Sequence, residues 1–261
     1  MSEQKMPVIF VGHGSPMNAI ENNDATFGWK NLKNIIKRPK VIIAISPCWA
    51  TDKLYVSNAD KNKQIFDIKN TNKKLQQIKY KPKGSPAYAE KIINNLEGMA
   101  EINNDWGIDY SIWEILLRMY PKADIPVVMM SCNIKEDEKF QFEVGEKLRN
   151  LRDEGALILA SGNIVHNLEL LRLDDSTESW AVQFNKETKE AIINKDFNTP
   201  LDYKKLEFAE DAVPEKSEFY TLLTALGAVE NNDKVEVFND FCVMGSISMT
   251  SFIFGDINEK R

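Results

Sequence analysis

The sequence predicts a single three-layer α/β domain in which helices flank a central, mostly parallel (mixed) sheet. Short, continuous apolar runs recur along the chain, stretches with helical periodicity separate them, and the runs end in small polar residues or glycine. Continuous runs of Val, Ile, Leu and Met are typical of strands covered on both faces, and strands that alternate with helices favour a parallel sheet. Because no Pro- or Ser-rich linker divides the 261 residues, we expect one domain over residues 1–261.

The strand-like runs lie at residues 7–11, 41–46, 125–131 and 156–160. Helical periodicity covers roughly residues 87–96, 111–119, 135–154, 180–194 and 217–226; the last of these begins after Pro214-Glu215 and ends at Gly227. Residues 59–83 are rich in Lys and Asn and poor in apolar residues. We expect them to form a long surface excursion, which is either a lid near a site or a solvated loop.

The composition argues against several classes of protein. A net charge of −6, from 33 basic and 39 acidic residues, disfavours a nucleic-acid-binding protein, which needs a basic surface. No apolar run reaches the ~18 residues that a membrane span requires, and the polar start of the chain predicts no signal peptide. Three cysteines form a sparse, odd set that suits a reducing compartment, so we expect a cytoplasmic protein.

The two histidines of the chain both follow predicted strands. His13 lies in Gly12-His13-Gly14 after the first run, and His166 follows Ser161-Gly162-Asn163 after the fourth. Ligands of open α/β sheets bind at the carboxyl ends of the strands, so we expect both imidazoles at one edge of the sheet. A chain with two histidines cannot build a site that needs three imidazoles.

Other motifs at this edge are weaker evidence for a functional site. Gly12-His13-Gly14 lacks the third glycine of a dinucleotide fingerprint, and no P-loop is present. Ser15 or Ser161 would have to act as a nucleophile without the usual Gly-x-Ser-x-Gly turn. Cys48 could pair with His166 as thiolate and imidazole, or be a small buried hydrophobic residue; Cys132 and Cys242 are interpreted as buried hydrophobic residues.

Several motifs spread over nearly the whole chain carry a family resemblance. They are Met6-Pro-Val-Ile-Phe-Val-Gly-His-Gly-Ser-Pro-Met-Asn18, Ser46-Pro-Cys-Trp49, Lys83-Gly-Ser-Pro-Ala-Tyr-Ala89, Trp106-Gly-Ile-Asp109, Met119-Tyr-Pro-Lys-Ala-Asp-Ile-Pro126, Leu151-Arg-Asp-Glu-Gly155, Ala160-Ser-Gly-Asn-Ile-Val-His-Asn-Leu168, Leu226-Gly-Ala228 and Met244-Gly-Ser-Ile-Ser-Met249. In this order they resemble the class III extradiol ring-cleavage dioxygenases of the LigB-like family. The resemblance is greatest to the 4,5-DOPA extradiol dioxygenase branch.

The resemblance implies a mononuclear metal site with one Fe(II) or Zn(II) per chain. Its ligands would be His13, Cys48 in place of a family histidine, and Glu218, with Glu215 as a nearby alternative. His166 matches the family histidine placed for acid–base catalysis, which some members use as a ligand. Two further family histidines are replaced, by Phe66 and Tyr110, and Asp67 or Tyr110 would supply hydrogen bonds to the substrate in their place.

Two candidate functions follow from this resemblance and from the positions at which the chain departs from the family pattern. The first is metal-dependent extradiol cleavage of a small, DOPA-like catechol with O2, by Fe(II) that keeps open coordination positions. The second is a catalytically silent or repurposed homologue, without a metal or with a non-redox one, because Cys48, Phe66 and Tyr110 replace site histidines and a thiolate favours Zn(II). The sequence leaves open whether the chain forms a homo-oligomer.

Overall fold

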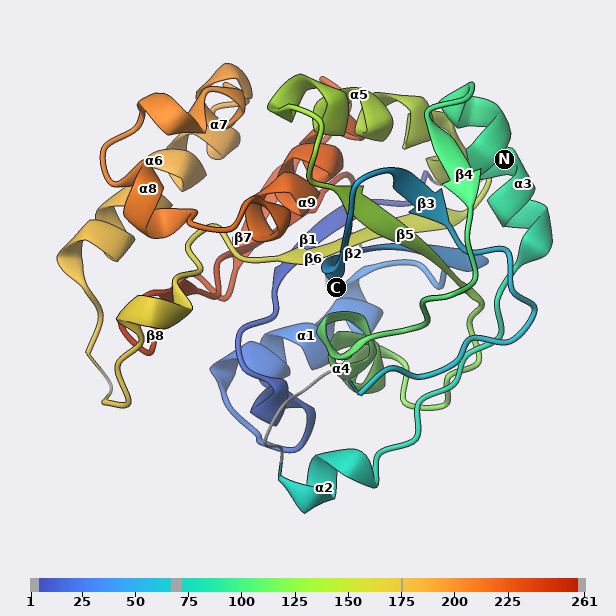
Figure 1. Ribbon diagram of the computed structural model, residues 1–261, viewed down its shortest axis with the longest axis horizontal. Coiled ribbons are helices and arrows are strands. Elements are labelled where there is room, and N and C mark those ends of the chain that lie inside the picture. The colour runs from blue at the N-terminus through green and yellow to red at the C-terminus, as the bar shows by residue number, and fades with distance from the viewer. Residues whose placement is uncertain (1–4, 67–71, 175, 258–261) are drawn as a thin grey trace.

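The sheet has eight strands, which the computed structural model resolves within its described residues, 5–66, 72–174 and 176–257 (Figure 1). Its strands are β1 (Val8–Gly12), β2 (Val41–Thr51), β3 (Leu54–Val56), β4 (Ala100–Ile102), β5 (Val127–Asn133), β6 (Ala156–Gly162), β7 (Val235–Phe238) and β10 (Ser251–Phe254). They are ordered β4-β3-β5-β2-β6-β1-β10-β7. The central strands β5, β2, β6 and β1 pair in parallel, whereas β10 pairs antiparallel with β1, and β7 pairs antiparallel with β10. A separate small sheet joins β8 (Cys242–Val243) and β9 (Ile247–Ser248).

Helices cover both faces of the sheet, as the continuous apolar runs predict. Figure 1 shows α1 (Asp24–Ile35) and α4 (Tyr110–Met119) on one side, and α3 (Pro86–Leu96), α5 (Glu138–Leu148) and α9 (Lys216–Gly227) on the other. Alternate residues of β1 divide between the two cores, because Ile9 packs with the α1–α4 layer and Val8 and Phe10 pack with the α9 layer. The predicted three-layer α/β architecture is confirmed.

The remaining helices are short or lie at the edge of the fold. They are α6 (Ser179–Ile193), α2 (Lys73–Gln76), α7 (Asn198–Leu201), α8 (Ala209–Ala212) and the 3-10 turns η1 (Pro16–Ala19), η2 (Arg149–Arg152), η3 (Leu168–Leu170) and η4 (Tyr203–Lys205).

Two glycines let α5 and α9 approach closely. A Cβ atom at Gly145 would collide with the carbonyl oxygen of Thr224, and one at Gly227 would collide with that of Phe142. Helix α9 in turn presses on β6, where a Cβ atom at Gly162 would collide with the carbonyl oxygen of Glu218. The position of α9 relative to the sheet is therefore fixed by backbone contacts, which is what places its first turn at the end of β6.

A buried ion pair fastens the turn before β6 to the chain after α9. Arg152 donates to both carboxylate oxygens of Asp233 at 2.7 Å, and also to the carbonyl oxygens of Met6 and Ala228. Both charged side chains are buried, and every oxygen in this set accepts from the guanidinium group. Full hydrogen bonding of this kind is what makes a buried charge tolerable.

The elements differ from the sequence prediction in several places. Strand β2 runs on through Pro47, Cys48 and Trp49 to Thr51, with a register shift against β5 between Ile45 and Ala50, so the predicted loop is an irregular strand end. The predicted helix 135–154 begins only at Glu138, because Asp137 caps it, and it continues after Leu148 as the turn η2. Helix α1 and strands β3, β4, β7 and β10 were not predicted.

Candidate active site

The turn after β1 places His13 at the carboxyl edge of the sheet. The amide of His13 donates to the carbonyl oxygen of Gly162 on the neighbouring strand at 3.4 Å, and Asn18 Nδ2 donates to the His13 carbonyl at 2.9 Å. A Cβ atom at Gly12 would lie 2.7 Å from the backbone of Met249, so the turn needs glycine there. The backbone thus holds a fully buried imidazole in one position.

His166 and Glu218 meet His13 at this edge. One ligand atom from each of the three residues lies within 4.8 Å of the other two. The rings of His13 and His166 have centroids 6.2 Å apart, and His13 Nδ1 lies 3.7 Å from Glu218 Oε2. His166 comes from the loop after β6, and Glu218 from the first turn of α9. The predicted convergence of the two histidines at one edge is therefore observed.

Burial sets the protonation states of this cluster. It lowers the pKa of His13 to about 3, with a further contribution from His166, and it lowers the pKa of His166 to about 4. It also raises the pKa of Glu218 to about 8, with repulsion from Glu215 and Asp109 adding to the effect. Near neutral pH both imidazoles are neutral and the Glu218 carboxyl is largely protonated, because charge is disfavoured away from water.

These donors fit a divalent cation. Within the described part of the chain, His13 Nε2 and Glu218 Oε2 are buried and have no hydrogen-bond partner. Unpaired polar atoms are costly inside a protein unless something satisfies them. Neutral imidazole nitrogens are metal ligands, and a bound cation would displace the proton from Glu218.

A second polar group adjoins the cluster, at the end of β2 and the start of α4. Its centre is the buried carboxylate of Asp109, which accepts from Ser46 Oγ at 2.6 Å, Ser111 Oγ at 2.7 Å and Trp106 Nε1 at 2.9 Å. The Ser46 hydroxyl also accepts from the amide of Cys48 at 3.1 Å. Asp109 therefore ties the strand that carries Cys48 to the helix that begins with Tyr110.

Cys48 and Tyr110 lie beside the His13 cluster. The hydroxyls of Ser111 and Tyr110 are near enough to the Cys48 thiol to act on its pKa. The pKa of the thiol lies well above its usual value because of burial first, and then because of the carboxyl groups of Asp109 and Glu218. The ring of Tyr110 meets the ring of His13 edge-on, at 5.7 Å between centroids. Among the described residues, Cys48 does not belong to the group whose ligand atoms all lie within 4.8 Å of one another.

The other predicted residues have varied surroundings. Asp67 lies outside the described residues. Phe66 is 42% exposed and packs on Trp113, with 5.8 Å between ring centroids.

Glu215 is the residue before α9, and its side chain is exposed. Ser161 lies in the site, with its Oγ atom 3.3 Å from His13 Nδ1. Cys132 is buried in the core as predicted, but Cys242 is half-buried.

Two acidic residues near the site were not predicted to matter. Asp109 was noted only as part of a motif, although a polar residue before a helix is a recognisable signal. Glu114 in α4 is 0% exposed, and neither of its carboxylate oxygens has a hydrogen-bond partner among the described residues. Burial raises its pKa well above the usual range, and Asp109 raises it further. A signal for Glu114 existed, because apolar residues stand on both sides of it in a predicted helix.

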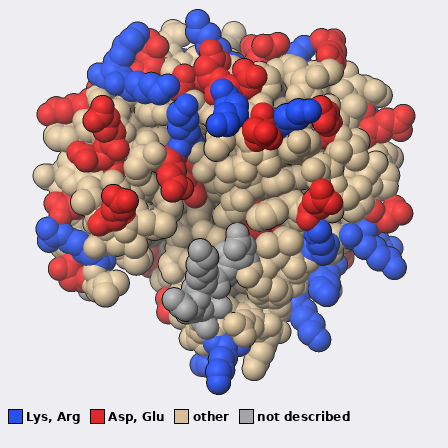
Figure 2. Space-filling view, viewed as in Figure 1, with Lys and Arg blue, Asp and Glu red and all other residues tan. Residues whose placement is uncertain are grey.

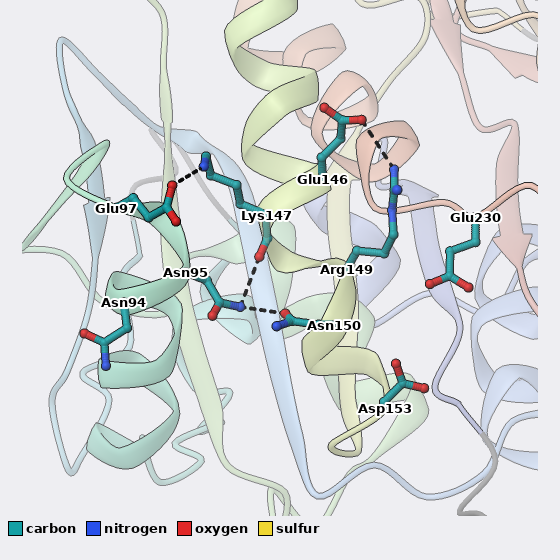
Figure 3. Close-up of a pocket in the computed structure, with 9 residues that line it drawn as sticks. All are labelled: Asn94, Asn95, Glu97, Glu146, Lys147, Arg149, Asn150, Asp153 and Glu230. Carbon is teal, nitrogen blue, oxygen red and sulfur yellow. Dashed lines mark hydrogen bonds and ion pairs between the residues drawn. The ribbon is translucent and has the colours of Figure 1, made fainter.

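Away from this edge, a polar cavity of about 480 Å³ lies between α3 and the end of α5 (Figure 3). Within its lining, Lys147 pairs with Glu97 and Arg149 with Glu146, and Asn95 donates to Asn150. Figure 2 shows acidic and basic groups interspersed over the face in view. Among the described residues that line this cavity, Arg149 Nε is the one buried side-chain atom without a hydrogen-bond partner, so no cluster of unpaired polar atoms is found there.

Comparisons with known proteins agree with the geometry. Residues 7–255 match the family described as the catalytic LigB subunit of aromatic ring-opening dioxygenase. The chain is 34% identical to 4,5-DOPA dioxygenase extradiol of Escherichia coli (strain K12), over 98% of this chain and 97% of that protein. It is 33% identical to 4,5-DOPA dioxygenase extradiol of Beta vulgaris, over 94% of this chain and 95% of that one.

A solved structure is similar as well. The crystal structure of an uncharacterized protein from Escherichia coli K12 superposes with a TM-score of 0.86 at 32% identity, covering 96% of this chain and 100% of that one. Within the described residues, none of the helices has the length and apolar character needed to cross a bilayer.

Proposed function

The chain belongs to the LigB family of aromatic ring-opening dioxygenases, and from this premise we propose that it cleaves a small catechol ring beside its two hydroxyl groups, with O2 and a bound Fe(II). Two relatives carry the name of 4,5-DOPA dioxygenase, so a DOPA-like catechol is the substrate class we expect.

One observation carries the proposal. His13, His166 and Glu218 offer two imidazoles and one carboxylate, with ligand atoms within 4.8 Å of one another. Two histidines and a carboxylate on one side of a metal are the ligand set of non-haem Fe(II) oxygenases, which leave further positions open. When bound, such an iron supplies those positions for the catechol and O2, together with the redox chemistry.

The ligand assignment differs in one residue from the family resemblance. Both assignments use His13 and Glu218. The resemblance supplies Cys48 as the third ligand and gives His166 the acid–base role, whereas the distances favour His166 as the third ligand. We assign the metal to His13, His166 and Glu218, and leave the protonated thiol of Cys48 outside the ligand set.

The neighbouring polar groups have roles toward the substrate. Tyr110 keeps its hydroxyl proton at neutral pH, because burial raises its pKa well above the usual value, and it can donate a hydrogen bond to a substrate oxygen. Asp109 holds the start of α4 in place through Ser46 and Ser111. Asp67 remains our expected second substrate contact.

The silent homologue is the less favoured alternative. The substitutions at Cys48, Phe66 and Tyr110 remove imidazoles, yet the remaining two histidines stay together with a buried carboxyl group. A chain that had lost metal chemistry would have no need to keep three costly polar groups at one edge, two of which, His13 and Glu218, have an unsatisfied buried atom among the described residues.

The experiment loads the purified protein with Fe(II) without oxygen and then adds air with a panel of catechols that includes DOPA. Ring opening is followed by the yellow absorbance of the semialdehyde product, and iron is measured in the same samples. We expect product from at least one catechol. Stoichiometric iron without product from any catechol would refute the proposal.

Variants test the ligand set. His13→Ala, His166→Ala and Glu218→Ala should each lose iron, and activity with it. Glu215→Ala is the matched control, because this exposed glutamate lies three residues before Glu218 and should keep both. If His166→Ala keeps its iron while the rate falls about 10²–10⁴-fold, His166 is the acid–base residue and not a ligand.

A further inference from the structure

Ser161 carries a buried hydroxyl that the proposed chemistry has not used. The sequence offers it as a nucleophile only without the usual Gly-x-Ser-x-Gly turn. In the structure it lies near the end of β6 with no exposed surface, and its Oγ atom is 3.3 Å from His13 Nδ1. The hydroxyl therefore contacts the ring of a proposed metal ligand.

The sheet fixes the position of this hydroxyl relative to the ring. Strands β1 and β6 pair in parallel, so that Ser161 lies opposite Val11. The amide of His13 continues this pairing and donates to the carbonyl oxygen of Gly162 at 3.4 Å. Both the serine and the imidazole are 0% exposed. The contact is thus set by the backbone of two adjacent central strands, and it is closed to bulk water.

A serine nucleophile needs a different arrangement. In a Ser-His-acid triad the hydroxyl contacts Nε2 of the ring, while the carboxylate holds the proton on Nδ1. Here Ser161 Oγ and Glu218 Oε2 both approach Nδ1 of His13, at 3.3 and 3.7 Å, and only the hydroxyl is within hydrogen-bond distance. The geometry therefore does not activate Ser161 for attack on a substrate.

The two ring nitrogens of His13 have different surroundings. Nδ1 has the Ser161 hydroxyl as a partner, whereas Nε2 is buried and has none in the described part of the chain. A neutral imidazole carries one proton, and the nitrogen that binds a metal must offer its lone pair. A proton on Nδ1 finds an acceptor in the hydroxyl and leaves the Nε2 lone pair free. A proton on Nε2 finds no acceptor and blocks that lone pair.

We propose that Ser161 is a positioning residue, whose hydroxyl oxygen accepts the Nδ1–H of His13 and so keeps the Nε2 lone pair available for the cation. Partners of this kind, on the second nitrogen of a metal-binding histidine, fix its tautomer and its ring orientation. The inference rests on the metal site of the proposed function, and it adds a residue that the ligand set does not contain.

Loss of the hydroxyl should weaken metal binding although every ligand remains. In Ser161→Ala the Nδ1–H of His13 has no acceptor, and a buried donor without a partner is unfavourable. The proton then moves to Nε2 in part of the molecules, or the ring turns, and both changes compete with the cation. Because replacing such partners in other metal sites costs about 10–100-fold in affinity, we expect a loss of that size here.

Nuclear magnetic resonance tests the tautomer in the native protein, without a substitution at Ser161. The chain has two histidines, so protein labelled with 15N in its imidazole rings gives two sets of ring signals, and His166→Ala shows which set belongs to His13. In metal-free protein near neutral pH we expect a protonated Nδ1 and an unprotonated Nε2. Zn(II), a cation without redox chemistry, should shift the Nε2 signal and leave the Nδ1 proton in place. A His13 ring protonated at Nε2 would overturn the inference.

Variants test the effect on the metal. Zn(II) affinity, measured by competition with a chelating dye, should fall about 10–100-fold in Ser161→Ala, and the Nδ1–H tautomer of His13 should no longer be the single form. Ser57→Ala is the matched control, because Ser57 is also a buried serine after a strand, 4% exposed, and its hydroxyl donates to Asn104. It should keep the native affinity and tautomer. Native Zn(II) affinity in Ser161→Ala overturns the inference, and so does weaker binding with an unchanged tautomer.

Fe(II) content and catechol cleavage, measured on the same proteins, separate this inference from the proposed function. Native protein that binds both cations with the expected tautomer but opens no catechol ring supports the role of Ser161 and refutes the proposed reaction. Protein that opens a catechol while Ser161→Ala keeps the native metal affinity leaves the proposed function standing and overturns the inference. Native protein that binds neither cation refutes both.

Discussion

Replacing Glu114 by Gln should change how the stability of the protein depends on pH. Glu114 is fully buried in α4, and neither carboxylate oxygen has a hydrogen-bond partner among the described residues. Arg118, which acts on it electrostatically, does not satisfy it, because that guanidinium donates to the carbonyl oxygens of Asn18 and Glu21. Burial, with Asp109 adding to it, raises the pKa of Glu114 well above its ordinary 4.5, so the folded protein holds this carboxyl group protonated.

The sign and size follow from proton linkage. Above pH 4.5 the unfolded chain loses this proton, whereas the folded chain keeps it until the pH reaches the raised pKa. Folding therefore takes up a proton in this window, and the free energy of unfolding falls by about 1.4 kcal/mol for each pH unit. Glutamine takes up none. Within this window, the native protein should lose about 1.4 kcal/mol relative to the variant for each pH unit.

Urea unfolding at a series of pH values, followed by tryptophan fluorescence, measures this difference. The slope is the quantity to compare, because the cost of burying the amide of glutamine shifts the whole curve and does not change with pH. Glu143→Gln on the exposed side of α5 is the control and should follow the native curve. Parallel curves for the native protein and Glu114→Gln would show that the folded state does not hold this proton.

Two further predictions concern packing and the buried ion pair. Asp233→Asn leaves the Arg152 charge buried without its carboxylate partner, so the free energy of unfolding should fall by about 3–5 kcal/mol; a loss below about 1 kcal/mol would mean that water satisfies the guanidinium group. Gly145→Ala should destabilise the protein by about 1–3 kcal/mol, because the added Cβ atom collides with the Thr224 carbonyl. In a helix without such a contact the same change stabilises by roughly 1 kcal/mol, so a gain in melting temperature would contradict the observed α5–α9 packing.

The central sheet could be predicted because its strands appear in the sequence as unbroken apolar runs. Residues 41–46 and 156–160 are buried on both faces, so their apolar runs are unbroken. Strands β3, β4 and β7 are three or four residues long and carry exposed or half-buried positions, which leaves no such run. Helix α1 was missed although its buried residues Ala25, Trp29 and Leu32 have helical spacing, because Gly28 and several Asn and Lys residues interrupt the pattern.

The position of the site in the fold could be predicted from the sequence more readily than the role of each residue in it. His13 and His166 are the two imidazoles of the chain and both follow buried strands, so their meeting required only the parallel topology. The choice between Cys48 and His166 as the third ligand depends on where side chains point at an irregular strand end. That direction comes from a register shift and from the hydrogen bonds of Ser46 and Asp109, neither of which has a signature in sequence.

A ligand set of two imidazoles and one carboxylate is physically consistent with a buried metal site. Neutral ligands alone leave the full charge of a divalent cation uncompensated in a buried site, where charge is costly. Glu218 supplies one negative charge there when its proton is displaced, so two imidazoles and this carboxylate form a sufficient set. The residue can do so because glycines at positions 145, 162 and 227 let α9 pack against its neighbours backbone to backbone. Widening any of these contacts should therefore weaken metal binding even though no ligand has changed.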